Sequence, residues 1–296
     1  MQQHLVRGLV HSQLTAAGPG IIPPPVDLHA NQAYAWGFLI CLGLVTIATL
    51  AYAIFDAWRT RSPLLTLLIL GGATFGAFAV EPTYDIIMAT WYPYDLPVQL
   101  LTVVGRPMAL MVVLAWIQIG VTAYISYQIV IAGWSASRTL GLFAAMSLVE
   151  GVMEMLCVHF GVMNYYGNHA TIFGVPLPSL VQNAGMFAVI GVALAALVPH
   201  LRGWRWVVTP FAVGMLYLGY VLSCTWPNFL AIQGQASTPA FWAAAAASSV
   251  LNAAIAVGAL HLPTAKQYRA RGFGPIPLAR ANTATTATSS ALTGQG

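Results

Sequence analysis

Charge is scarce in this sequence. Asp, Glu, Lys and Arg together make up 6% of the 296 residues, whereas hydrophobic residues make up 58%. Soluble proteins carry about 25% charged residues, so this composition is typical of a membrane protein. The net charge of +4 comes without a basic patch that alternates with aromatic residues, and we therefore expect no nucleic-acid partner.

Lysine and the common metal- and nucleotide-binding motifs are also missing from the apolar part of the chain. The one lysine, Lys266, follows the last apolar run, so no span offers an amine for a retinal Schiff base. There is no HExxH motif, histidine box, DDxxD-like run, P-loop or dinucleotide fingerprint. These absences argue against a rhodopsin, a zinc protease, a di-iron oxygenase, a magnesium-dependent prenyltransferase and a nucleotide-binding enzyme. We expect neither a metal nor a cofactor.

Cysteine is rare as well. Cys41, Cys157 and Cys224 all fall within apolar runs, and an odd number of cysteines in such positions does not predict a disulfide framework. We interpret them as small core residues, because cysteine is among the residues most often buried.

Seven long apolar runs dominate what is present. A helix needs about 20 apolar residues to cross a hydrocarbon layer of about 30 Å, and each run is long enough. The sequence predicts an all-α, seven-transmembrane-helix bundle over residues 33–262, after an exported tail (1–32) and before a basic, disordered cytoplasmic tail (263–296). The predicted spans are residues 33–55, 63–88, 107–132, 139–160, 178–200, 207–225 and 239–261.

The cations predict the orientation of this bundle. With seven spans, nine of the eleven Lys and Arg residues fall on one side of the membrane, and only Arg7 and Arg106 fall on the other. Cytoplasmic loops carry the excess of cations, so we predict that the N-terminus is outside and the C-terminus inside.

The acidic residues are the strongest functional candidates. Of seven acids, Glu81, Glu150 and Glu154 lie within predicted spans, and Asp85 lies one turn beyond Glu81. An acid at mid-membrane costs about 2.5–3.5 kcal/mol on insertion scales, so it is a functional candidate by default. Glu81 and Asp85 are four residues apart, as are Glu150 and Glu154, so each pair shares one helix face. We predict that all four are catalytic.

Other polar and aromatic residues gather at the same, outer level of the predicted bundle. We predict that they bind substrate: Arg106, His159, Asn164, Tyr165, Tyr166, Asn168, Asn183, Trp91 and Trp226. Structural roles remain open for them. Tyrosine and tryptophan form interfacial belts in most membrane proteins, Arg106 could neutralise Asp95 or Asp85, and the histidines could be solvated loop residues. The acids themselves could form a polar helix-packing cluster.

Paired carboxyl groups in a low-dielectric site point to acid–base chemistry. Two such neighbours do not both ionise readily, so one stays protonated at neutral pH and can act as a general acid. Aromatic faces can shelter a cation that develops on a lipophilic substrate. The other carboxylate, or a histidine, can take the proton back.

Residues 150–183 read EGVMEMLCVHFGVMNYYGNHATIFGVPLPSLVQN, with acids in a span, a Gly- and Tyr-rich turn and a Gly-Val-Pro before the next span. This pattern, with EPTYD at residues 81–85, resembles the AveC-like spirocyclase family of actinobacterial membrane proteins. A similar pattern of acids, glycine, tyrosine and Gly-Val-Pro occurs in membrane carotenoid hydratases. Small membrane terpene cyclases also use carboxylates in a helical bundle. The resemblance implies a multi-pass protein of the bacterial plasma membrane that acts on a lipophilic polyketide or terpenoid.

From these observations we predict an integral-membrane cyclase, spirocyclase- or dehydratase-like, whose partners are a lipophilic small-molecule substrate and membrane lipid. Glu154 or Glu150 would supply the acid, and Glu81 or Asp85 would be the base. Arg106 would keep one carboxylate ionised. Substrate oxygens would be oriented by Tyr165, Tyr166, Asn168 and Asn183. A proton-coupled transporter or a sensor is the alternative from another class. A transporter is disfavoured by the missing internal repeat and by the lack of a comparable polar set near the inner face.

Overall fold

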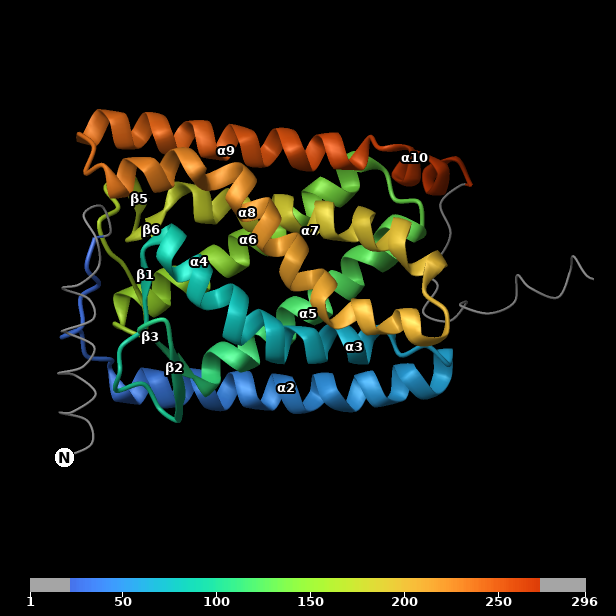
Figure 1. Ribbon diagram of the computed structural model, residues 1–296, viewed down its shortest axis with the longest axis horizontal. Helices are drawn as coiled ribbons and strands as arrows, with labels where there is room; N and C mark the ends of the chain where they lie inside the picture. The colour runs from blue at the N-terminus through green and yellow to red at the C-terminus, as the bar shows by residue number, and fades with distance from the viewer. Residues whose placement is uncertain (1–21, 272–296) are drawn as a thin grey trace, which may run out of the picture.

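The computed structural model describes residues 22–271, and most of them are helical (Figure 1). Seven helical spans in this part of the chain are long and apolar enough to cross a membrane, which indicates a multi-pass membrane protein and confirms the predicted number of spans. Their bounds are Gln32–Thr60 (α2), Leu64–Met88, Leu110–Ile131 (α5), Ala136–His159 (α6), Leu177–His200, Gly203–Gln233 and Thr238–Leu260 (α9).

Three of these spans contain more than one helical segment. The second consists of α3 (Leu64–Gly71), the π-helix η1 (Gly72–Val80) and α4 (Glu81–Met88). The fifth joins α7 (Leu177–Leu197) to the short η2 (Val198–His200), and the sixth joins η3 (Gly203–Val208) to α8 (Thr209–Gln233). A short helix, α10 (Pro263–Ala270), follows the last span.

The sixth span is longer than predicted. The prediction ended it at residue 225, but α8 continues through Pro227 to Gln233, so Trp226 and Asn228 lie inside the helix. Proline breaks the helical hydrogen-bond ladder. Here the hydroxyl of Ser248 on α9 accepts a hydrogen bond from the backbone N–H of Asn228 at 3.3 Å. Neighbouring helices often satisfy backbone groups in this way within membranes, and the sequence alone does not show such a partner.

The third span begins later than predicted, and Arg106 is not its first residue. Arg106–Ala109 forms strand β3, which pairs with β2 (Gln99–Val103), and α5 begins only at Leu110. The two residues between the strands, Val104 and Gly105, have φ angles of 49° and 74°. Two consecutive positive φ angles are the signature of a tight type I′ hairpin turn. Arg106 is therefore placed by a rigid hairpin.

Short strands connect the loops at one end of the bundle, which we call the strand end (Figure 1). Strand β1 (Thr90–Trp91) pairs with β4 (Asn164–Tyr165), and β5 (Thr171–Ile172) pairs with β6 (Val175–Pro176). The backbone N–H of Tyr166 also donates to the carbonyl of Ala89 at 2.9 Å. These contacts join the chain after the second span to the chain after the fourth. The two helices that carry the acid pairs therefore end side by side.

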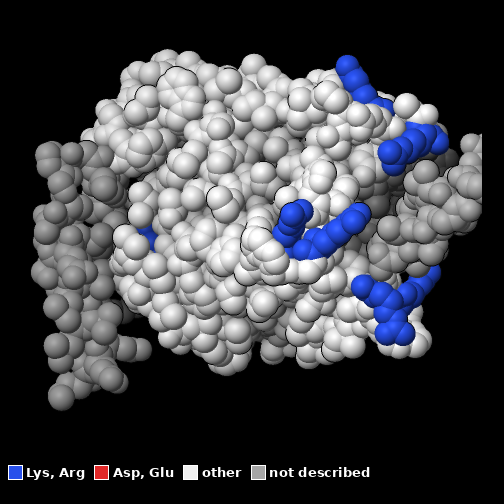
Figure 2. Space-filling model, turned by 45° about the vertical axis from the view of Figure 1, so that its right-hand side comes forward, with Lys and Arg blue, Asp and Glu red and all other residues white. Residues whose placement is uncertain are grey.

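The cations gather at the opposite end, which we call the basic end (Figure 2). Arg106 belongs to the strand end, whereas the other Lys and Arg residues between positions 22 and 271 lie at or beyond the opposite ends of the spans. Those residues are Arg59, Arg61, Arg138, Arg202, Arg205, Lys266, Arg269 and Arg271. Arg7, Arg280 and most of both predicted tails lie outside the described residues.

Glycines in the second span allow close packing at the centre of the bundle. A side chain at Gly72 would meet the backbone of Trp116 on α5, and one at Gly76 would meet the Trp116 ring. The π-helix η1 ends just before Glu81, and Pro82 lies in the first turn of α4, where its missing N–H is tolerated. The close packing at Gly72 and Gly76 places Trp116 against the second span, and Glu81 follows at the start of α4. Trp116 and Glu81 therefore lie close together.

Candidate functional site

Glu81 lies buried at the start of α4 and is held by two neutral donors. The hydroxyl of Tyr92 donates to its Oε1 at 2.9 Å, and the indole Nε1 of Trp116 donates to its Oε2 at 2.9 Å. The side chain is only 7% exposed. Both oxygens of this carboxyl group are therefore fixed in place by residues from another helix and from the following loop.

Glu154 on α6 is held in the same manner. Its Oε2 accepts hydrogen bonds from the hydroxyls of Tyr165 and Ser179, each at 3.1 Å, and these two hydroxyls lie 3.3 Å apart. Glu150, one turn earlier on the same helix, is half-buried and has no hydrogen-bond partner within residues 22–271. Each predicted pair thus contains one carboxyl group that is bound by donors and one that is not.

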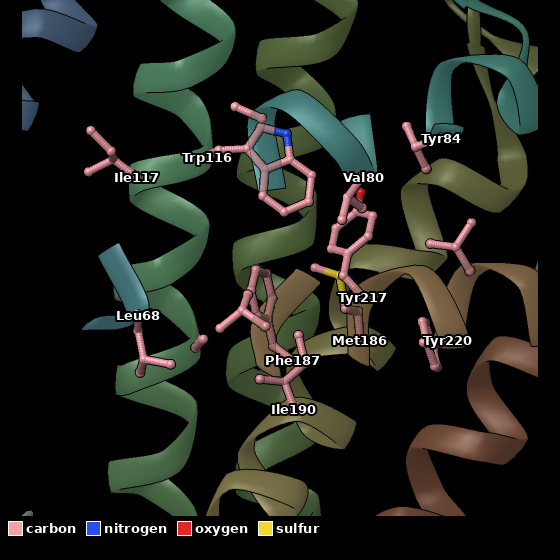
Figure 3. Packing of buried hydrophobic residues seen from close by; sticks show 14 of the residues in the cluster. Leu68, Val80, Tyr84, Trp116, Ile117, Met186, Phe187, Ile190, Tyr217 and Tyr220 are labelled. Carbon is pink, nitrogen blue, oxygen red and sulfur yellow. The ribbon is translucent and has the colours of Figure 1, made fainter. Parts of the chain in front are cut away.

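Three aromatic rings pack against one another beside Glu81. Tyr217 of α8 contacts Tyr84 edge-on with ring centroids 5.7 Å apart, and it contacts Trp116 at 4.9 Å. Tyr84 and Tyr217 both lie within electrostatic range of Glu81, Glu150 and Glu154, and Glu81 and Glu154 also interact with each other. Figure 3 shows Trp116, Tyr217 and Met186 packed in this region. We call the three glutamates with Tyr84 and Tyr217 the acidic core.

Asp85 is the most deeply buried of the four predicted acids. It is 1% exposed, and both of its carboxyl oxygens lack a hydrogen-bond partner among the described residues. It lies within electrostatic range of Glu81 and of Arg106. Asp85 therefore interacts with both the acidic core and Arg106.

Arg106 is buried among aromatic rings. It is 4% exposed, and its guanidinium donates to the carbonyl of Thr90 at 2.9 Å and to the hydroxyl of Tyr166 at 2.6 Å. It also lies over the rings of Trp91 and Tyr166, 5.4 and 5.5 Å from their centroids. No acid within residues 22–271 comes within 4.0 Å of it, and Asp95 pairs with His29 at 3.0 Å instead. Arg106 therefore forms no direct ion pair with Asp95 or Asp85, although it lies within electrostatic range of Asp85.

The loop tyrosines at the site remain protonated donors. Burial, with the nearby Glu81 carboxylate, raises the pKa of Tyr92 well above its usual range. Burial, with Glu154, does the same for the pKa of Tyr165. Burial also raises the pKa of Tyr166, although the neighbouring Arg106 opposes this effect. All three phenols can thus donate hydrogen bonds at neutral pH.

The remaining predicted binding residues divide into two groups. Trp91 and Asn183 are buried near the site, Asn164 pairs with Trp91 in the β1–β4 ladder, and Asn168 links the carbonyl of Met88 (3.0 Å) to the amide of Asn228 (3.2 Å). His159, at the end of α6, is exposed, and Trp226 is 53% exposed on the surface of α8. These last two lie outside the buried cluster.

Several residues at the site escaped the sequence analysis. Tyr84 and Tyr217 belong to the acidic core, and Trp116 and Ser179 donate hydrogen bonds to its glutamates, but each comes from an apolar run in which nothing marks its partner. Asp56 is a further buried acid, near the basic end, and its carboxyl oxygens accept from the hydroxyl of Tyr124 at 3.2 and 3.1 Å. Its position at the edge of a predicted span was the available signal.

Comparison with models of known protein families, with curated proteins and with solved structures finds no match. The fold and the site define a multi-pass helical membrane protein with a buried carboxyl and tyrosine cluster near the strand end.

Proposed function

We propose that this protein is an integral-membrane cyclase, spirocyclase- or dehydratase-like, that uses carboxylate acid–base catalysis without a metal. Its substrate is a lipophilic polyketide or terpenoid. It lies in the bacterial plasma membrane with the strand end outside and the basic end inside, in agreement with the charge asymmetry. The observation that carries the proposal is the acidic core, in which three glutamates lie within electrostatic range of two tyrosines inside an apolar bundle.

The pattern of hydrogen bonds supports a distinct role for each glutamate in this core. Donors surround Glu81 and Glu154, so their oxygens are held as acceptors, and Glu81 takes the proton from an attacking hydroxyl. No donor faces Glu150, and a charge without partners is costly in an apolar interior. Glu150 therefore carries the proton, and Glu154, one turn away, relays it to the substrate. Tyr84, Tyr217 and Trp116 supply aromatic faces for the developing cation.

A spiroketal reaction fits these roles and balances. One hydroxyl of a dihydroxy-ketone adds to the carbonyl and gives a hemiketal. The acid then protonates the hemiketal hydroxyl, which leaves as water and forms an oxocarbenium ion. The second hydroxyl attacks this ion and gives its proton to the base. The net change is the loss of one water, and the proton returns to the acid through the paired carboxyl groups.

Two alternatives share this core. A membrane terpene cyclase or a carotenoid hydratase would use the same acid to protonate an alkene. A proton-coupled transporter or sensor is favoured by one observation, the buried Asp56–Tyr124 pair near the basic end, which gives the bundle a second ionisable site. A proton flux into liposomes that Asp56→Asn abolishes would support transport over catalysis.

The test is mass spectrometry of whole-cell lipid extracts. Extracts from wild type are compared with those from a strain that carries the Glu81→Gln and Glu154→Gln double substitution. We expect a product to disappear and a species of equal mass, or one water heavier, to accumulate. Asp95→Asn in the surface loop is the matched control and should leave the extract unchanged. Full product formation by the double variant, present at normal level in the membrane, contradicts the proposal.

A further inference from the structure

Unpartnered polar atoms concentrate around Arg106. Both carboxyl oxygens of Asp85, the hydroxyl of Thr90 and the indole N–H of Trp91 are buried and have no hydrogen-bond partner among the described residues. Thr90 binds Arg106 through its carbonyl, and Trp91 lies under the guanidinium. Asp85 interacts with Arg106 electrostatically. We call these four residues the Arg106 site.

Such atoms are rarely left without partners. A buried donor or acceptor without a partner costs about 1–3 kcal/mol, so native proteins bind nearly all of them to protein, water or ligand. Four unpartnered atoms occur here on three residues that contact Arg106 or lie within its electrostatic range. Arg106 adds to them, because its guanidinium has five N–H donors and only two bonds to the protein account for them. The hairpin and the β1–β4 pair hold these groups rigidly.

We propose that the Arg106 site binds the polar end of the substrate, and that this end is an uncharged group with both donors and acceptors, such as a vicinal diol or a hydroxy-ketone. Hydroxyl groups of the ligand donate to Asp85, while its oxygens accept from Arg106, Thr90 and Trp91. The Asp85 carboxyl group would disfavour a carboxylate or phosphate, and the Arg106 cation would disfavour an amine. A neutral, hydroxylated end can form hydrogen bonds with both Asp85 and Arg106.

This inference rests on the proposed function and changes the role of one residue within it. Asp85 was predicted to be a catalytic acid or base. With both oxygens unpartnered and Arg106 within electrostatic range, it becomes a binding residue, and Glu81 alone remains as the base. Asp85 interacts electrostatically with Arg106 and Glu81, and Glu81 interacts with Glu154. The polar end of the substrate then lies nearer the strand end, and its reacting carbon lies beside the acidic core.

Binding can be measured without turnover. The full-length protein in lipid nanodiscs is titrated with radiolabelled dodecane-1,2-diol, and binding to empty nanodiscs is subtracted. Unlabelled dodecane-1,2-diol, dodecanoate and dodecylamine then compete. We expect saturable binding for which only the diol competes. Thr90→Val removes one unpartnered atom with little change of shape, and Trp91→Phe removes the indole N–H together with part of the ring. Each should weaken binding about 5- to 10-fold. Asp85→Asn should weaken it about 10-fold or more.

Thr83→Val is the matched control. Thr83 lies on the exposed face of α4, the helix that carries Asp85, and its hydroxyl donates to the backbone carbonyl of Ala79. This change should therefore leave binding unaltered. Binding that does not saturate, or that Thr90→Val, Trp91→Phe and Asp85→Asn leave unchanged, would overturn the inference and assign these atoms to water. Saturable diol binding together with unchanged lipid extracts in the Glu81 and Glu154 double variant would keep the binding site and reject the cyclase.

Discussion

At the scale of single residues, the site depends on neutral donors that hold carboxyl groups in place. Glu81 and Glu154 each accept hydrogen bonds from two side chains, and a tyrosine from a strand-end loop is one of the two in both cases. The loops therefore fix the geometry of acids that lie inside the membrane. Removing one loop tyrosine should disturb its glutamate without unfolding the bundle.

Tyr165→Phe tests this dependence. The change removes the donor to Glu154 and the contact with Ser179, but it keeps the ring. We expect product formation to fall about 10-fold, because a hydrogen bond to a charged group contributes about 1.5–3 kcal/mol. The measurement is product level in lipid extracts at equal protein level. Tyr94→Phe, which removes a hydroxyl that binds only the Gly105 carbonyl, is the control. Equal loss in both variants would count against a specific role for Tyr165.

The buried loop tyrosines also predict a loss of stability at alkaline pH. The pKa values of Tyr92 and Tyr165 are raised well above the usual value in the folded protein, mainly by burial. The unfolded chain loses these protons near pH 10, whereas the folded protein retains them. The free energy of unfolding therefore falls as the pH rises above about 10. Thermal unfolding midpoints of the purified protein between about pH 8 and 11 should show this decline. A Tyr92→Phe, Tyr165→Phe variant should show a shallower one, and an identical slope would refute the explanation.

At the scale of elements, the π-helix and its glycines connect the second span to α5. Gly76 leaves room for the ring of Trp116, and Trp116 in turn donates to Glu81. A widened turn of this kind inside an α-helix is often found at functional sites. The packing of η1 against α5 is thus part of the site.

Gly76→Ala should damage both packing and activity. The added methyl group would collide with the Trp116 ring and move its indole N–H away from Glu81. Overpacking of this kind typically costs about 1–3 kcal/mol. We expect a lower thermal unfolding midpoint and reduced product. Gly43→Ala on α2 is the matched control, because a side chain there meets nothing within 4 Å. A Gly76→Ala protein as stable and as active as the Gly43→Ala protein would contradict the role of this contact.

Much of the element-level structure could be predicted from the sequence, because length and hydropathy determine which segments can span a membrane. The seven spans were predicted in this way, and the i, i+4 spacing marked both acid pairs. The strand at Arg106 was not predicted, although its partner β2 lies only two residues away, because the apolar run over residues 107–132 was interpreted as one helix. The continuation of α8 through Pro227 was not predicted either, because it depends on Ser248, a partner that is distant in the sequence. Trp116 and Ser179 were missed for the same reason. An apolar run does not show which of its residues faces an acid on another helix.

At the scale of the whole molecule, the bundle has two different ends. The strand end contains Arg106, the acidic core and the three short sheets, whereas the basic end contains the other described cations (Figure 2). The proposed orientation follows from this difference. In this proposed orientation, the site lies nearer the outer surface of the membrane than the inner one.

Cysteine labelling tests the orientation. Val104 in the β2–β3 turn is 74% exposed, and Trp204 near the basic end is 81% exposed. A membrane-impermeant maleimide should label Val104→Cys in intact cells, and it should label Trp204→Cys only after permeabilisation. The unsubstituted protein, with its three cysteines, measures the background. The reverse pattern would place the strand end in the cytoplasm.

The most direct test of the central claim is conversion in isolated membranes. The species that accumulates in the Glu81 and Glu154 double variant is purified and incubated with membranes that contain wild-type protein, and with membranes that contain Glu154→Gln. We predict that wild-type membranes convert it into a cyclic product of equal mass or one water lighter, without added metal or nucleotide, and that Glu154→Gln membranes do not. Equal conversion by both membranes, or by neither, would contradict catalysis by the acidic core.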